Sequence, residues 1–244
     1  ESLENERALG DGELMAFIRL GNDLTNNFYE VQIPLDPTNF GETNPEAIWP
    51  LANRLNLPLA QLQEVKTLAL AYYRSNPNAD PTEVIFYDQE ELDGGVSGGG
   101  NPLKIGIKGN PNFGNVRTIM IGVKNATGDD LCGEVWVNEL RLTELDNKGG
   151  WAAVVSLDAN MADFATVNAM GSMSTVGFGS LEQGPNQRSM EDVQLYDVLT
   201  NVNLGQLLPP KWGIQLPFNY SRSEELITPK YDPQYGDVEL QSRL

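Results

Sequence analysis

The chain has 244 residues, with 34 acidic against 16 basic side chains and a formal net charge of −18. This excess of acid argues against a nucleic-acid-binding surface, because phosphate contacts need clustered Lys and Arg. The sequence has no histidine and one cysteine, Cys132, which excludes histidine-based triads, multi-cysteine metal sites and internal disulfides. We therefore expect no catalytic residue, no metal, no cofactor and no enzyme activity.

The two ends of the chain carry little information about targeting. No basic stretch followed by an apolar run opens the sequence, so no signal peptide is recognised. No run approaches the ~18 consecutive apolar residues of a membrane-spanning helix. We expect both ends to be cuts within a longer polypeptide.

Residues 1–148 contain short apolar or alternating runs separated by turn residues, which predicts a mainly β domain. The loop-forming residues 108–115 predict a hairpin between two of these runs. Residues 58–74 fit a helix with Leu62, Val65 and Ala69 on one face, although part of this range also fits a strand. The expected strands are 13–20, 28–35, 82–87, 103–107, 116–123 and 134–142, and their number favours a jelly-roll-like β-sandwich.

Residues 149–244 show a second pattern, in which apolar or small residues alternate with mostly uncharged polar ones. The alternation is regular in 151–161 and recurs in 165–171, 198–204 and 212–220. Such runs of about ten residues are typical of transmembrane β-barrel strands, whose side chains face lipid and a wet lumen in turn. We expect lipid contact at Val155, Leu157, Ala159, Met161, Ile214, Leu216 and Phe218, lumen contact at Ser156, Asp158, Asn160, Gln215 and Asn219, and membrane-interface positions for Trp151, Trp212 and Tyr220.

The barrel interpretation carries conditions of its own. Four strands cannot close a barrel, since about eight is the observed minimum, so the rest of a larger chain or other subunits must complete it. The connections near 162–163 and 208–211 are short, whereas the polar loop 180–192 between them is long. Because short turns of outer-membrane barrels are periplasmic, this parity predicts that residues 1–148 lie outside the cell as a cap.

Soluble alternatives remain open. Alternation also describes an ordinary sheet with one face on a core, and Pro217 indicates an edge, a bulge or a strand end. A secreted carbohydrate-binding β-sandwich with Trp136 on its ligand face is one alternative, and a glycosidase with two catalytic carboxylates is another. The acidic run 88–93 offers carboxylates to Ca²⁺ but lacks the EF-hand spacing, so a solvated loop is the simpler interpretation.

Several long strings of the chain are specific enough to compare with known families. They are CGEVWVNELRLTELDNKGGWAA at 132–153, DANMADFA at 158–165, GFGSLEQGPN at 177–186, WGIQLPFNY at 212–220 and EELITPKYDP at 224–233. These strings resemble one known family, the SprA/Sov outer-membrane translocon of the Bacteroidetes type IX secretion system. The resemblance is dense over 132–233 and thinner over 1–131, where it rests mainly on YEVQIPL at 29–35.

This resemblance implies a fold and partners that composition does not show. It implies a single-chain barrel of very large strand number in the cell outer membrane, of which this chain is a fragment, acting in secretion and gliding motility. Implied partners are the remainder of the translocon chain, a PorV-type shuttle protein, a periplasmic plug protein, folded cargo with a C-terminal sorting domain, and the lipid bilayer. No catalytic residue is implied.

Overall fold

The computed structural model describes residues 9–39, 41–80, 82–96, 99–143, 148–184 and 187–240. The chain divides into two compact units. Unit 1 comprises residues 1–140 together with 234–243, and unit 2 comprises residues 141–233. Each unit contains one antiparallel sheet, and helices are few, so the expectation of a mainly β protein is confirmed. Residues 234–240 belong to unit 1, whereas the sequence pattern groups them with residues 149–244.

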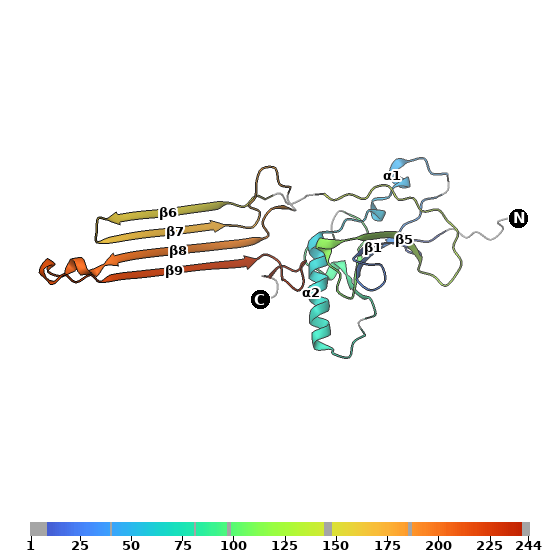
Figure 1. Cartoon of the computed structure of the whole chain (residues 1–244). Helices are drawn as coiled ribbons and strands as arrows, with labels where there is room; N and C mark the ends of the chain where they lie inside the picture. The colour runs from blue at the N-terminus through green and yellow to red at the C-terminus, as the bar shows by residue number, and fades with distance from the viewer. Residues whose placement is uncertain are drawn as a thin grey trace. The chain divides into compact units, whose positions relative to one another are not determined.

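Unit 1 contains a five-stranded antiparallel sheet (Figure 1). Its strand order is β3-β4-β2-β1-β5, so β3 and β5 form the two edges. A long helix and several single turns connect the strands. The elements are β1 (Leu14–Gly21), β2 (Phe28–Leu35), α1 (Pro45–Ile48), α2 (Leu59–Ser75), β3 (Ile85–Asp88), β4 (Lys104–Lys108) and β5 (Thr118–Asn125), with 3-10 turns at Leu51–Asn53, Gln89–Glu91 and Phe113–Asn115.

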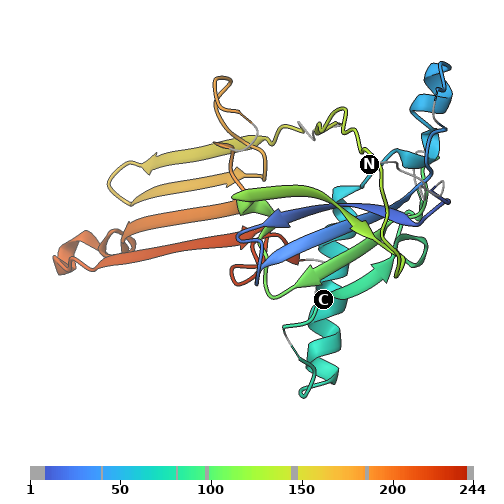
Figure 2. The ribbon, with the colours of Figure 1, turned by 90° about the vertical axis from the view of Figure 1, so that its right-hand side faces the viewer.

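The core of unit 1 lies between α2 and one face of this sheet (Figure 2). Leu62, Val65 and Ala69 recur at helical spacing and are all buried, which confirms the helical interpretation of this range. They pack in one cluster with alternate residues of the central strands, among them Tyr29 and Ile105. No helix within the described residues is long and apolar enough to cross a bilayer.

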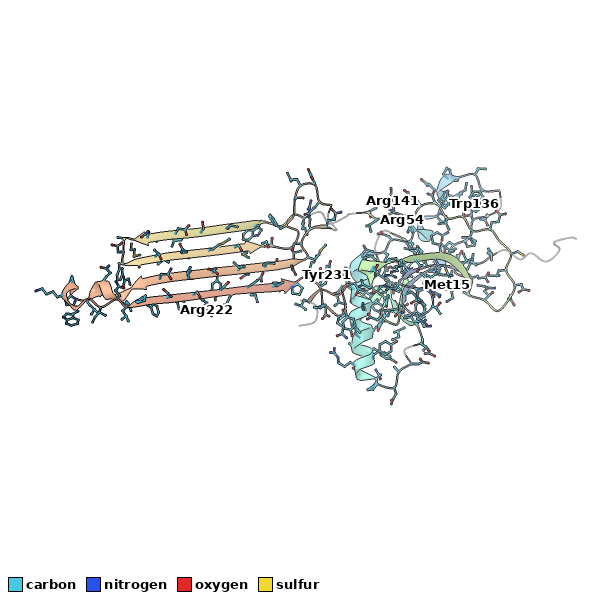
Figure 3. All side chains as sticks on the ribbon, viewed as in Figure 1. Met15, Arg54, Trp136, Arg141, Arg222 and Tyr231 are labelled. Carbon is cyan, nitrogen blue, oxygen red and sulfur yellow. The ribbon has the colours of Figure 1, made fainter. Side chains whose placement is uncertain are left out.

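Two predictions for unit 1 are wrong. The expected hairpin across 108–115 does not form, because β5 pairs with β1, whereas β4 pairs with β2 and β3. The expected strand 134–142 is absent, since its backbone finds no neighbouring strand among the described residues. Trp136, labelled in Figure 3, belongs to this segment. Its side chain is 72% exposed. A second sheet packed on the first would be needed for a sandwich, so the jelly-roll-like arrangement remains a prediction.

Unit 2 is a four-stranded antiparallel meander in the order β6-β7-β8-β9 (Figure 1). The connections span 162–164, 175–190 and 204–216. The chain therefore enters β6 and leaves β9 at the same end of the sheet. The strands are β6 (Ala152–Met161), β7 (Ala165–Ser174), β8 (Glu191–Asn203) and β9 (Pro217–Pro229).

The last connection differs from the prediction. It is not short, because 3-10 turns at Leu204–Leu207 and Pro210–Trp212 fold the chain back on itself, with the Leu204 amide bonded to the Leu216 carbonyl. Gly213 follows the second turn in the left-handed region, at φ 59°, and ends it. The expected strand start at residue 212 is therefore wrong. Pro217 is the first residue of β9, where its missing N–H is tolerated.

Candidate functional site

The strands of unit 2 are unusually long. They have 10, 10, 13 and 13 residues, whereas strands of globular proteins most often have about 5–6. At ~3.4 Å per residue, ten residues cover about 34 Å, enough to cross the ~30 Å hydrocarbon core of a bilayer. The sheet therefore has the dimensions of a membrane-spanning sheet.

One face of this sheet, here called the apolar face, is defined by the odd-numbered residues of β6. Val155, Leu157, Ala159 and Met161 stand in register with Gly171, Ala169, Val167 and Ala165 of β7. Every residue of this face on β6 and β7 is apolar or glycine. The face continues across β8 and β9 through Val198, Val202, Phe218 and Tyr220. Its larger side chains are exposed, and Leu157 is 56% exposed, so the described chain leaves this surface uncovered.

The opposite face, here called the polar face, carries Ser156, Asp158 and Asn160 from β6. At the end where β6 stops, one row across the sheet consists of Asn160, Thr166, Asn201 and Asn219. Asn201 donates an amide hydrogen bond of 3.3 Å to the hydroxyl of Thr166. Three residues of this row, Thr166, Asn201 and Asn219, line a shallow hollow together with Gln215. The other end of the polar face includes apolar side chains such as Val154 and Ile227, so the separation of the faces is sharpest toward this hollow.

The structure brings most of the predicted site residues onto these two faces but leaves some in connections. Phe218 shares the apolar face and Asn219 the polar face. Three of the predicted residues lie outside any strand, namely Ile214, Gln215 and Leu216. The alternation of lipid and lumen contacts predicted for a strand therefore does not apply to them. For the aromatic residues, Trp151 directly precedes β6, Trp212 ends a 3-10 turn, and Tyr220 lies within β9.

The apolar face also carries a charged group that the sequence pattern did not predict. Arg222 and Glu224 alternate with Tyr220 along β9 and form an ion pair, in which Arg222 Nε donates to Glu224 Oε1 over 2.9 Å. Tyr196 of β8 stands opposite Glu224. Arg222 lies in the middle of its strand, as Figure 3 shows. The predicted run ended at residue 220; extending its period of two would have placed both charges on this face.

The charges of the polar face have one sign. Asp158, Asp197 and Glu225 project from it, and among the residues of the four strands Arg222, on the other face, is the only basic one. A surface of amides, hydroxyls and carboxylates remains hydrated, so it suits an aqueous lumen. Within the described residues, no group of three or more acidic or cysteine side chains is placed to hold a metal ion.

The two outer strands of the sheet in unit 2 decide whether this unit could span a membrane by itself. In the described chain, β6 and β9 each have one edge without a neighbouring strand. Within a bilayer, unpaired backbone groups cost several kcal/mol each, so spanning sheets close into barrels. A membrane role therefore requires further strands beyond both edges.

Comparison with known proteins identifies a family. A family model, SprA_N, described as motility related/secretion protein, matches residues 2–244. No curated protein matches the chain. Because the family model covers both units, the chain belongs to the SprA_N family of motility-related and secretion proteins.

Proposed function

We propose that unit 2 is part of the wall of a protein-conducting channel in the outer membrane, through which a type IX secretion system exports folded cargo. The observation that carries this proposal is the pair of opposed faces on strands long enough to span a bilayer. Membership of a motility and secretion family supports it. The remainder of the same translocon chain supplies the strands that close the barrel.

In this proposal the two faces of the sheet have different roles. The apolar face of β6 and β7 contacts lipid tails, since an Arg or Lys side chain there would be unfavourable by about 2–4 kcal/mol near the midplane. The polar face lines the wet interior and excludes lipid. The ion pair of Arg222 and Glu224 marks a part of the apolar face that lipid tails do not cover.

The wider setting of the channel is likewise proposed. Residues 1–148 lie on the outside of the cell, which the short connection 162–164 favours on the assumption that short turns are periplasmic, and the chain acts without catalysis. A PorV-type shuttle protein, a periplasmic plug protein and cargo with a C-terminal sorting domain are the proposed partners. The resemblance to the SprA/Sov translocon supports the proposed partners, and the lack of histidine supports only the proposal that the chain acts without histidine-based catalysis.

Cross-linking to cargo tests the proposed channel. In full-length protein carrying Cys132→Ser, single cysteines replace Asn160 on the polar face or Leu157 on the apolar face, and cargo is arrested during export. We expect a thiol-reactive cross-linker to capture cargo from position 160 and not from position 157. Equal capture from both positions, or capture from position 157 alone, would contradict the proposed orientation of the sheet.

A further inference from the structure

Unit 1 is built from two stretches of chain that the whole of unit 2 separates in sequence. Residues up to 140 make its sheet and helix, and residues 234–243 return to it after β9. Within the returning stretch, Val238 is 1% exposed and Asp237 is 3% exposed. The returning chain is therefore part of the interior of unit 1.

The carboxylate of Asp237 is held by three donors from three elements of unit 1. Tyr29 on β2 donates its hydroxyl to Oδ2 over 2.8 Å, and the backbone N–H of Phe113 donates to the same atom over 2.9 Å. Lys66 on α2 forms an ion pair with Oδ1. The helix, the sheet and the connection between β4 and β5 therefore meet at a single acidic side chain.

Lys66 depends on this partner. Its side chain is 2% exposed, and its other hydrogen bond is donated to the Pro111 carbonyl over 2.7 Å. Burial lowers the pKa of the Lys66 ammonium, and Asp237 acts to raise it again. Without Asp237, unit 1 would hold a buried charge that no anion compensates, which is strongly unfavourable.

The neighbouring residues give the returning chain a defined shape. The amide of Val238 donates to the carbonyl of Tyr235 over 2.9 Å, which closes a turn around Asp237. The ring of Tyr235 lies 5.4 Å from Lys66 Nζ. The segment 235–238 thus presents a carboxylate, an aromatic ring and an apolar side chain to unit 1.

We propose that residues 235–238 are a strap that completes unit 1, so that unit 1 becomes stable only after β6–β9 have been made and β9 has ended. The chain is made from its N-terminus, so Lys66 is present long before Asp237. Unit 1 therefore stays open while the strands of unit 2 form. This inference does not depend on the proposed membrane location of unit 2.

Hydrogen exchange on the full chain tests whether the strap stabilises unit 1. We expect Asp237→Asn to accelerate exchange of the buried amides of β2 and β4 by roughly tenfold or more. Asp88→Asn is the matched control, because it removes the same charge from an exposed pair with Lys104 in the same unit. Adding Lys66→Met to Asp237→Asn should recover most of the lost protection, since it removes the uncompensated charge. Wild-type exchange in Asp237→Asn, or no recovery in the double variant, would overturn the strap.

Pulse-labelling during refolding of the full chain tests the order of events. We expect the amide of Val238, which marks the closed strap, to become protected no later than the buried amides of β2 and β4. Full protection of β2 and β4 before Val238 would overturn the proposal, because unit 1 would then be complete without its strap.

Discussion

Replacing Leu157 by arginine is the most informative single substitution in the proposed lipid-facing surface. Leu157 lies at the middle of β6, is paired with Ala169, and has exposed apolar neighbours on its own face. If this position lies near the bilayer midplane, Leu157→Arg is unfavourable by about 2–4 kcal/mol. Since 1.4 kcal/mol is a factor of ten, the ratio of folded to unfolded protein should fall by about 30- to 700-fold.

The adjacent residue provides the control. Asp158 is exposed on the polar face of the same strand, so Asp158→Arg introduces the same side chain one position away. The assay is the fraction of full-length protein in purified outer membranes that resists trypsin. We expect a large loss for Leu157→Arg and a small one for Asp158→Arg. Equal losses, or a larger loss for Asp158→Arg, would refute the assignment of faces.

Further predictions concern unit 1 and the absence of catalysis. Leu62→Ala should lower the stability of unit 1 by about 2–5 kcal/mol in denaturant titrations, because Leu62 is fully buried against the sheet. Asp23 accepts backbone hydrogen bonds from Asn26 and Thr25, which hold the pKa of its carboxyl well below 3.8. Asp23→Ala should therefore lower the melting temperature at pH 7. The difference between the two proteins should shrink as pH falls below 3.8. The exposed native Cys132 should react with a membrane-impermeant maleimide on intact cells, whereas reaction only after permeabilisation would place unit 1 in the periplasm. The purified chain should hydrolyse no member of a glycan and ester panel, and activity abolished by replacing a carboxylate pair would contradict this.

Local patterns predicted the individual elements of the fold well where periodicity and burial agreed. The run 28–35 forms β2 with those bounds, and the spacing of Leu62, Val65 and Ala69 identified the buried face of α2. Pairing between strands was harder to predict, because it depends on which edges are free. β5 pairs with β1, which precedes it by about a hundred residues, and no short-range signal indicates that partner.

In the candidate site too, local features could be predicted from the sequence and features that depend on distant residues could not. Alternation in 151–161 identified β6 and its two faces, since a period of two is a property of the strand itself. Residues 134–142 alternate in the same way but form no strand. Alternation determines which side chains share a face, whereas a strand also needs a neighbouring backbone to pair with. The predicted start of β9 is too early, because residues 212–216 alternate like a strand although they belong to the connection before β9. The strap was not predicted, because nothing local in Asp237 or Lys66 indicates that they meet.

Accessibility along β6 tests most directly whether this sheet stands between lipid and water. In full-length Cys132→Ser protein in bilayers, single spin labels at each position from 153 to 160 would be probed with oxygen, which partitions into lipid, and with a water-soluble nickel chelate. We predict a period of two in both profiles and opposite phases, with oxygen access highest at 155, 157 and 159 and nickel access highest at 156, 158 and 160. Profiles in the same phase, or nickel access that is high at every position, would contradict a membrane-spanning sheet.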